Sequence, residues 1–409
     1  MTQARVLSAD VVATLASAVP PVANVERSHA GVSAEIVDAA RLDEVRAHWS
    51  TLLASTDSPN VFMDPVLLHA AANADRAMPL RAVLAWRTVE GRRRLAGLWA
   101  FALTAPPRSI LPMRVLTAPP SSHSYLATPV IDRGVLDETL DAMLDAVAAG
   151  AGPIAALDMM AADDATFAAL QRVLARRGSA ACVIEETARP KLASGLDGKA
   201  YLEAALSSGT RKKLRQYRRR LAEKGAVTFT IADQPAAVRA ALEDFLAIEA
   251  AGWKGREGTA VLSTSADAAF MRAAVAALAE EGRASVLSLR LDGKPVSMQL
   301  VARCGAVAYT WKTTYDEAYQ DYSPGMLLLE DYTAAFLADR TIAFVDSCAF
   351  DASSYMAAWQ ERRPVVELWI DARRGRHFSF VALSRAHKLY RRLRRDVKAA
   401  VHAWQKWRR

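Results

Sequence analysis

The segment Ser323-Pro324-Gly325 could bind a phosphate group. Ser is a favoured N-cap residue and Pro a favoured first helical residue, so a helix is expected to begin here. The first turn of a helix has unpaired backbone N–H groups and a partial positive charge. Gly325, Met326 and Leu327 would direct such groups at a phosphate, and Gly325 would permit its close approach. An ordinary helix cap is the simpler alternative.

Other residues that could react or bind a metal form no recognisable group. The three cysteines, Cys182, Cys304 and Cys348, lie far apart in no metal-ligand spacing, so neither a disulfide framework nor a zinc ribbon is expected. Cys304 and Cys348 have no His close to them in sequence, which favours unreactive thiols over a thiol nucleophile. The seven His form no ligand pair with helical spacing. We therefore expect no metal and a reducing, cytoplasmic location.

An α/β pattern surrounds the Ser323 segment. Apolar residues alternate on both sides of Asp292-Gly293, which is typical of a hairpin, and a third alternating stretch completes an antiparallel meander. Apolar residues three and four apart predict helices around it. In chain order, the second half is expected to contain a strand at 227–231, helices at 235–253 and 266–281, strands at 287–291, 296–302 and 307–312, a helix from Ser323, a strand at 341–347, a helix at 353–362 and a strand at 365–370.

The first half repeats this order more faintly, which indicates a duplicated fold joined near Arg189-Pro190. The length of 409 residues suits two or three domains, and 52% hydrophobic with 23% charged residues excludes a wholly disordered chain. In the first half, strands are expected at 32–37, 80–88, 95–103, 113–117, 154–159 and 180–186, with helices at 39–54, 64–74, 135–148 and 164–177. We divide the chain into a flexible arm at 1–31, a first domain at 32–190, a basic linker helix at 191–226, a second domain at 227–371 and a basic amphipathic helix at 372–409.

The order of elements resembles the GNAT acyltransferase fold. Several motifs resemble more closely the CelD-type GNAT proteins labelled with cellulose biosynthesis, which are themselves similar to the FemAB peptidyltransferases with their two GNAT-like halves. The resemblance is strong over residues 195–365 and weak over 32–190. The residues that carry it are Arg211, Leu214-Arg215, Arg219-Arg220-Leu221, Glu249-x-x-x-Trp253-Lys254, Tyr309-x-Trp311, Tyr315, Ser323-Pro324-Gly325, Asp346, Tyr355 and Trp359.

The resemblance implies two tandem GNAT-like domains, each with a mixed, mostly antiparallel sheet flanked by helices. The first would be degenerate and the second would bind acetyl-CoA or another acyl-CoA. Two departures stand out, since Leu327 replaces the second glycine of the usual GNAT loop and Met356 replaces a Lys that often follows the last Tyr. The residues expected to bind the cofactor are Tyr309, Trp311, Ser323, Pro324, Gly325, Met326 and Leu327, and those expected to bind the acceptor are Trp253, Lys254, Lys312, Tyr315 and Trp359.

Three residues are candidates for proton transfer in such a reaction. Direct transfer needs a base for the acceptor and an acid for the departing thiolate. Glu249 and Asp346 are the candidate bases, and Tyr355 stands where related enzymes can keep a thiolate-protonating Tyr. Each has a structural alternative, because Asp346 could cap the following turn and Glu249 could pair with Lys254 or Arg256.

The expected function is transfer of an acyl group, with acetyl as the first choice, to an amine or hydroxyl of a sugar, polysaccharide precursor or small molecule. Direct attack in a ternary complex is expected, since no nucleophile triad is visible. One alternative is a FemAB-like aminoacyl or peptidyl transferase that uses charged tRNA. Another is a non-catalytic scaffold of exopolysaccharide synthesis. The sequence leaves the acceptor, the acyl chain length and the oligomeric state open.

Positive charge is concentrated in two segments. The whole chain has a net charge of +8. Residues 372–409 carry 13 Lys and Arg against one acid, and residues 210–224 carry eight against one, so the remainder is acidic. The segment at 210–224 could contact an anionic acceptor or the 3′-phosphate of CoA, or could simply be a solvated helix. The chain is therefore not a uniformly basic nucleic-acid binder, and we expect no nucleic-acid partner.

The basic tail has the pattern of an amphipathic helix. Apolar residues recur at three- and four-residue steps, namely Leu383, Ala386, Leu389 or Tyr390, Leu393, Val397, Ala400 or Val401, Trp404 and Trp407. We expect this stripe to pack on the acidic body, in preference to contact with the inner membrane surface or with a synthase. No stretch of about 18 uncharged apolar residues, as a membrane-spanning helix needs, is present in the sequence.

Overall fold

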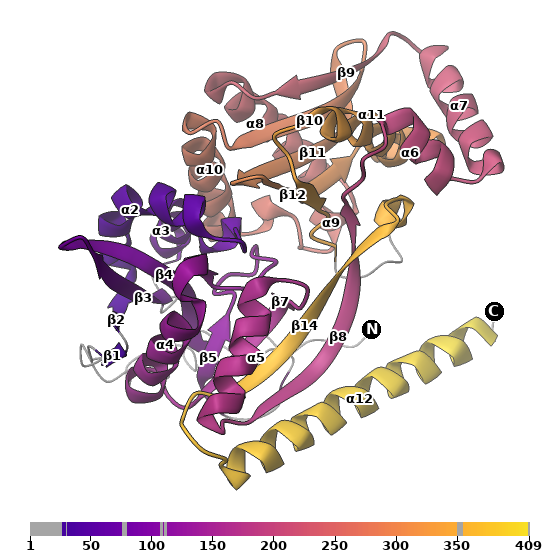
Figure 1. Cartoon of the computed structure of the whole chain (residues 1–409). Coiled ribbons are helices and arrows are strands. Elements are labelled where there is room, and N and C mark those ends of the chain that lie inside the picture. The colour runs from indigo at the N-terminus through magenta and orange to yellow at the C-terminus, as the bar shows by residue number, and fades with distance from the viewer. Residues whose placement is uncertain are drawn as a thin grey trace.

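One mixed β-sheet of 14 strands runs through both halves of the chain (Figure 1). The structure is a computed structural model, and it describes residues 27–29, 31–75, 80–106, 109, 113–349 and 355–407. Helices cover both faces of the sheet, so the fold is α/β, with a large mixed sheet, as the sequence predicted. The strand order is β1-β2-β3-β4-β5-β7-β14-β8-β13-β12-β11-β10-β9, and β6 pairs with β4 beside this path.

The first half builds one end of the sheet from antiparallel strands and a single parallel pair. Consecutive strands from β1 to β5 pair in antiparallel fashion, and β5 and β7 then pair in parallel. The strands are β1 (Arg27–His29), β2 (Val32–Asp38), β3 (Leu80–Val89), β4 (Arg92–Thr104), β5 (Val115–Ala118), β6 (Val130–Ile131), β7 (Ile154–Ala161) and β8 (Ala181–Leu192). The helices are α2 (Leu42–Ser55), α3 (Pro65–Ala74), α4 (Leu136–Gly150) and α5 (Ala165–Arg177).

The second half repeats this arrangement at the other end of the sheet. Strands β9 to β12 form an antiparallel meander, and β12 and β13 pair in parallel. The strands are β9 (Val227–Ala232), β10 (Ala284–Leu291), β11 (Lys294–Cys304), β12 (Val307–Tyr315), β13 (Phe344–Asp346) and β14 (Glu361–Asp371). The helices are α6 (Gly198–Ala205), α7 (Ser208–Ala222), α8 (Pro235–Ala251), α9 (Trp253–Arg256), α10 (Ser265–Glu280), α11 (Pro324–Ala338) and α12 (Phe378–Trp407).

The two halves exchange their last strands. β14 ends the second half, yet it pairs with β7 of the first half. β8 ends the first half, yet it pairs with β13 of the second half. β8 and β14 also pair with each other in antiparallel fashion, from Lys191↔Glu361 to Ala181↔Ile370. Each half therefore needs a strand of the other to complete its sheet, an arrangement that alternation of apolar residues could not reveal.

Three sequence expectations differ from the structure. The basic linker helix expected at 191–226 is instead the end of β8 followed by two separate helices, α6 and α7. The helix expected at 353–362 is a short 3₁₀ turn, Tyr355–Ala358, and β14 already begins at Glu361, where the backbone pairs with β8 instead. Residues 353 and 354 lie outside the described residues, as does most of the arm expected at 1–31, of which 27–29 form β1 on the edge of the sheet.

No single helix in the described ranges is long and apolar enough to span a membrane. The bent pair Trp253–Ser263 and Ser265–Glu280 passes such a test by length and composition alone. Seven residues of the second helix, Ala268, Phe270, Met271, Ala274, Val275, Leu278 and Ala279, are buried within the protein. Core helices of water-soluble proteins have the same composition, so this pair has an ordinary explanation.

Candidate active site

A cavity of about 360 Å³ lies at the start of α11. Its walls come from the end of α8 with α9, from the end of β12, and from the turn that leads into α11. Most of the residues that the sequence singled out around Ser323 meet here. The lining residues are Glu249, Gly252, Trp253, Lys254, Thr313, Thr314, Tyr315, Gln320, Ser323, Pro324, Gly325, Met326 and Tyr355.

The turn into α11 differs from the expected phosphate cradle. Ser323 has a φ of 45° in the left-handed region, and its side chain makes no cap hydrogen bond. Its carbonyl instead accepts from the N–H groups of Met326, at 2.9 Å, and Leu327, at 3.2 Å. Pro324 has no N–H. Of the described amides in this turn, the Gly325 N–H alone has no hydrogen-bond acceptor within the protein. One N–H group is therefore available to a ligand, where the sequence predicted three.

Gly325 gives the first cavity open space. A Cβ atom added at this position would meet no heavy atom within 4 Å. By contrast, the side chain of Leu327 is fully buried in the core and does not line the cavity. The expected role of Leu327 in cofactor binding is therefore not supported, since both its amide and its side chain are used within the protein.

A second cavity, of about 500 Å³, adjoins the first. The two have four lining residues in common, Trp253, Lys254, Thr313 and Tyr355. The first half of the chain contributes to it through Tyr125, a residue that no sequence pattern singled out. The other lining residues are Gln299, Thr310, Trp311, Lys312, Ser347, Cys348, Ala349 and Met356.

Glu249 is buried at the boundary of the two cavities and both of its carboxylate oxygens are engaged. Oε1 accepts from Lys254 Nζ at 3.0 Å, and Oε2 accepts from the backbone N–H of Val261 at 2.8 Å. Lys254 Nζ also donates to the carbonyl of Thr313 at 2.7 Å. Arg256 pairs with Glu317 instead. The structural alternative for Glu249, a pair with Lys254, is thus present in the structure.

Lys312 is the second cation next to Glu249. Its Nζ lies 3.8 Å from Glu249 Oε1, and its side chain is nearly buried against the second cavity. Burial lowers the pKa of Lys312 because the ammonium form loses hydration, and Lys254 lowers it further, while Glu249 acts in the opposite direction. Lys312 therefore releases its proton more readily than an ordinary Lys.

Tyr355 lies where the two cavities meet. Its hydroxyl forms side-chain hydrogen bonds with Thr313 and Tyr332. Burial raises the pKa of Tyr355, so that its hydroxyl stays protonated at neutral pH and can donate a hydrogen bond or a proton. This position agrees with the role of acid that the sequence suggested.

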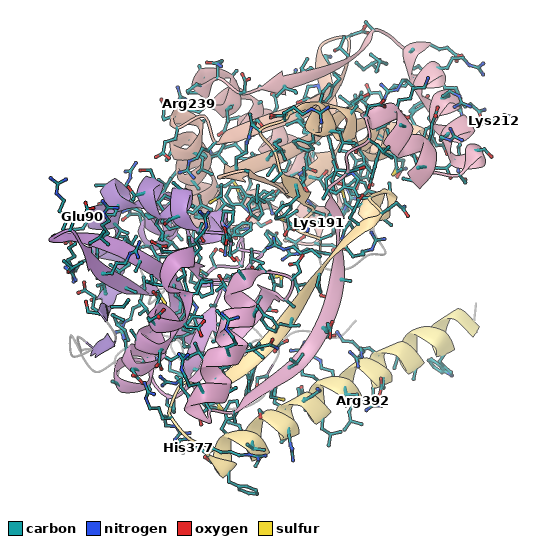
Figure 2. The ribbon with its side chains drawn as sticks, viewed as in Figure 1. Glu90, Lys191, Lys212, Arg239, His377 and Arg392 are labelled. Carbon is teal, nitrogen blue, oxygen red and sulfur yellow. The ribbon has the colours of Figure 1, made fainter. Side chains whose placement is uncertain are left out.

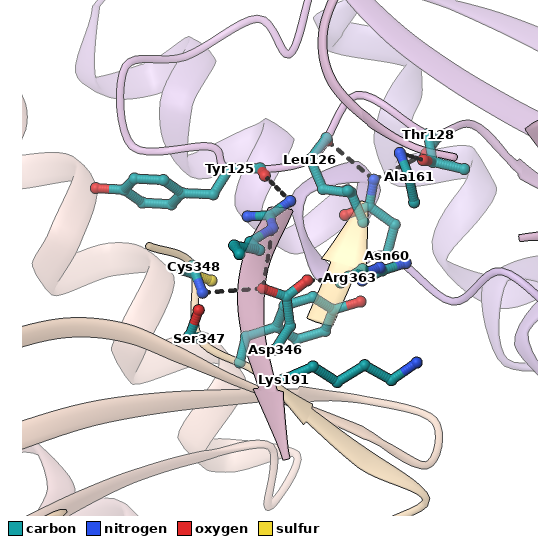
Figure 3. A network of polar contacts seen from close by, with 12 residues as sticks. Asn60, Tyr125, Leu126, Thr128, Ala161, Lys191, Asp346, Ser347, Cys348 and Arg363 are labelled. Atoms are coloured by element: carbon teal, nitrogen blue, oxygen red, sulfur yellow. Dashed lines mark hydrogen bonds and ion pairs between the residues drawn. The ribbon is translucent and has the colours of Figure 1, made fainter. Parts of the chain in front are cut away.

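Asp346 lies in a buried ion-pair cluster behind the wall of the second cavity and lines neither cavity (Figure 3). Its Oδ2 accepts from Arg363 Nη1 at 2.7 Å, and its Oδ1 accepts from the Cys348 N–H at 2.9 Å and lies 3.3 Å from Arg189 Nε. Although burial opposes it, the two arginines lower the pKa of Asp346. A carboxylate held in this way is a poor base, and the geometry favours the structural alternative for Asp346 over the catalytic one.

Three aromatic residues that the sequence placed in the site have other positions. The Tyr309 hydroxyl donates to the Pro59 carbonyl at 2.6 Å, inside the core between the halves. Trp359 is fully buried and donates to Thr333 Oγ1 at 2.9 Å. Neither lines a cavity. Trp311 lines the second cavity, not the first, and donates through Nε1 to the carbonyl of His123.

Residues 208–353 match the family model described as an acetyltransferase (GNAT) domain. The match begins at α7 and extends past β13, so it contains most of the lining residues of both cavities. This segment, less than half of the chain, is therefore similar to GNAT acetyltransferase domains. No curated protein has a sequence that matches the chain at a significant level.

Several solved structures with low sequence identity align with most of this chain. FemX has 13% identity over 80% of this chain and 95% of its own, with a TM-score of 0.53. The C-terminal domain of a putative lysylphosphatidylglycerol synthetase from Agrobacterium fabrum has 14% identity over 85% and 95%, with a TM-score of 0.48. A tandem GNAT protein from the clavulanic acid biosynthesis pathway has 14% identity over 83% and 98%, with a TM-score of 0.41. At these identities the similarity to FemX shows the fold alone.

Proposed function

We propose that the chain is an acyltransferase that binds acyl-CoA in the first cavity and its acceptor in the second. The observation that carries this proposal is the wall of four residues that the two cavities share. A thioester that reaches this wall from the start of α11 would meet an acceptor that enters from the Tyr125 side. Direct transfer needs this kind of juxtaposition of donor and acceptor.

The phosphates of the donor would lie at the first turn of α11. The Gly325 N–H is free, and the open space beside Gly325 lets a bulky group approach the positive end of the helix. One free amide is a weak cradle by itself, so additional cations are needed. α7 supplies them, because Arg220 lies over the Tyr322 ring at 5.6 Å, directly before the turn.

The reaction would proceed by attack of an amine or hydroxyl on the thioester carbonyl. The neutral amine of Lys312 would take the proton of the acceptor, and Glu249 would stabilise the ammonium ion that results. The C–S bond breaks as the new C–N or C–O bond forms, and Tyr355 would give a proton to the thiolate. Cys348 lines the second cavity, but burial raises the pKa of its thiol well above its usual value, which disfavours a covalent route.

Two lysines next to one carboxylate favour an acceptor with a negative group. Lys254 is held by Glu249 and Thr313, whereas Lys312 has Glu249 as its nearest acid, 3.8 Å away. An acceptor carboxylate or phosphate would bind Lys254, which lines both cavities, so that Lys312 can remain the neutral base. An anionic sugar or a polysaccharide precursor meets this requirement, in line with the CelD-type resemblance.

Calorimetric titration of acetyl-CoA and of CoA into the full chain tests the donor half of the proposal. Binding at micromolar concentration is expected for the native protein and is expected to be lost in Gly325→Trp, whose side chain would fill the first cavity. Gly195→Trp is the matched control, because a Cβ there also meets no atom within 4 Å and Gly195 lies outside both cavities. No binding of either ligand by the native protein would refute an acyl-CoA donor.

A second candidate function is transfer of an aminoacyl group from charged tRNA. The observation that favours it is the exposed basic surface of α7, with Lys212, Lys213, Arg215, Arg219 and Arg220, close to a turn that offers only one amide. RNA binding through these residues would weaken steeply as salt is raised. If the protein binds neither CoA nor RNA, both transferase functions are refuted and the non-catalytic scaffold is the alternative that stands.

A further inference from the structure

The helix α12 turns its polar side toward the sheet. Its buried residues Phe380, Ser384, His387 and Arg391 recur at steps of four and three and so form one face. The His387 ring stacks on Trp369 of β14 with the ring centroids 4.4 Å apart. Three of these four inward residues are polar, an unusual composition for the packed side of an amphipathic helix.

Ion pairs hold this inward face to the two exchanged strands. Arg391 donates to Glu367 of β14 at 2.7 Å and to Glu185 of β8 at 2.6 Å. Arg395 reaches Glu185 at 3.2 Å. The first turns of the helix are attached by apolar packing of Phe380, with Val381 and Leu383, and the next turns by arginine–carboxylate contacts.

The apolar stripe of α12 faces solvent. Leu389, Leu393, Val397 and Val401 follow one another at four-residue steps and are 58%, 56%, 62% and 44% exposed. Trp404, three residues further on, is 50% exposed. The expectation that this stripe packs on the body holds for Leu383, which packs against the core at the start of the helix. It is wrong from Leu389 onward, because the body offers acids that bind the arginines of the opposite face.

The second part of α12 extends beyond the body. Every described side chain from Arg392 to Val401 is exposed, and Figure 1 shows the end of the helix standing clear of the sheet. From Arg392 to Trp407 the helix is about 24 Å long, at 1.5 Å per residue. Figure 2 places Arg392 on this helix, on a different part of the molecule from Lys212 of α7.

Positive charge borders the exposed stripe. Arg385, Lys388, Arg392, Arg394 and Lys398 are exposed, and Asp396 is the one acid between residues 372 and 409. This charge disfavours packing of α12 against the same helix of a second copy, because like charges would be brought together. It favours a negatively charged surface instead.

We propose that α12 binds the surface of an anionic lipid bilayer, with its leucine and valine stripe among the acyl chains and its arginines and lysines at the lipid phosphates. Apolar residues on one face, cations on the flanks and a Trp near the end define a helix that lies in a membrane interface. The inward ion pairs to Glu185 and Glu367 would hold the rest of the protein against that surface.

Co-sedimentation of the full chain with vesicles tests this surface. Vesicles with about a third of phosphatidylglycerol in phosphatidylcholine are expected to bind the protein at least tenfold more tightly than phosphatidylcholine alone, and the binding is expected to weaken in about 0.5 M salt. Leu393→Glu with Val397→Glu is expected to lower the partition coefficient at least tenfold. Both side chains are exposed, so the variant is expected to keep its fold and melting temperature.

Ile231→Glu is the matched control, since it introduces an acid at an apolar residue that is 48% exposed on β9, far from α12 in sequence. It should bind vesicles nearly as tightly as the native protein. No vesicle binding, or equal binding by the double variant, would overturn the proposal. A dimer in light scattering that the double variant abolishes would assign the stripe to a second copy and overturn it as well.

Discussion

The helices α4 and α11 occupy the same place in the two halves but differ at their first turns. α11 connects β12 to its parallel partner β13, and α4, together with the short β6, lies between β5 and its parallel partner β7. The first turn of α4 contains Asp137 and Glu138, whereas that of α11 contains no acid and opens with Pro324 and Gly325. Acidic side chains in a first turn stabilise the positive end of the helix, as in α4. The first turn of α11 has no such acid, which suits the phosphate binding that we propose there.

The strands that precede these helices show the same division. β5 has four residues and β12 has nine. The extra length of β12 carries Lys312, Thr313 and Tyr315 to the walls of the cavities. The two halves therefore contribute differently to the site. The first half provides one lining residue of the second cavity, Tyr125, and the second half provides the other lining residues of both cavities.

The largest expected effect comes from the cluster that ties the halves together. Asp346 on β13 pairs with Arg189 on β8 and Arg363 on β14, so it joins the three strands at the exchange. Asp346→Ala would remove the acid next to buried Arg189 and would leave buried Arg363 with only its longer contacts to Asp163, at 3.5 Å, and Asp164, at 3.8 Å. It is expected to destabilise the protein by about 3–5 kcal/mol. Denaturant unfolding followed by fluorescence measures this change.

The control is Asp244→Ala, which breaks an exposed pair with Arg290 and should cost at most about 1 kcal/mol. Both halves are expected to unfold in one transition, because each needs a strand of the other. Two separate transitions in Asp346→Ala, with the second half unfolding alone, would contradict the view that the exchanged strands make one unit.

Lys312→Met is expected to reduce the acyl transfer rate by about 10²-fold or more while the protein stays folded. The pKa of Lys312 is lowered mainly by burial, so the native rate should rise as pH increases through that pKa and then level off. The variant should lose this rise. A pH profile of kcat/KM checks both points, with exposed Lys294→Met as the control. An unchanged profile in Lys312→Met would exclude Lys312 as the base.

The first turns of α4 and α11 can be made more alike. Met326→Asp adds an acid to the start of α11 and is expected to weaken acetyl-CoA binding by about fivefold, since one charge at a helix end contributes about 1 kcal/mol. Asp137→Asn with Glu138→Gln removes the acids of α4 and should leave the affinity unchanged. Calorimetry measures both, and tighter binding by the α4 variant would show that the first half also holds the donor.

His387 should make the attachment of α12 depend on pH. Burial, aided by Arg391, lowers the pKa of His387 to about 4. In the unfolded chain the group titrates near 6.5, so the unfolded state binds a proton first as pH falls. The stabilisation by neutral His387 is complete above pH about 6.5 and is lost as pH falls toward 4. Thermal unfolding should show a smaller loss over this range in His387→Phe, and an equal loss would refute this role.

Periodicity and turn residues predicted most of the elements, because these signals are local. Alternation located the meander, and Ser323-Pro324 located the start of α11. The exchange of β8 and β14 depends on contacts between residues far apart in sequence, such as Lys191 and Glu361. Local sequence patterns do not indicate which distant strands pair with each other.

The candidate site was predictable where motifs marked it and not elsewhere. Glu249, Lys254, Gly325 and Tyr355 line the cavities, as their motifs suggested. Asp346 has the residue type of a base, yet its two arginine partners come from distant strands. Tyr125 was missed because it reaches the second cavity from the other half of the chain.

Amide hydrogen exchange with and without saturating acetyl-CoA tests most directly the claim that the second half alone holds the donor. Peptides that cover residues 323–330, at the start of α11, are expected to exchange more slowly with the ligand present. Peptides that cover residues 135–142, at the start of α4, should not change. Slower exchange at α4, or no change at α11 in protein that binds acetyl-CoA, would contradict the account.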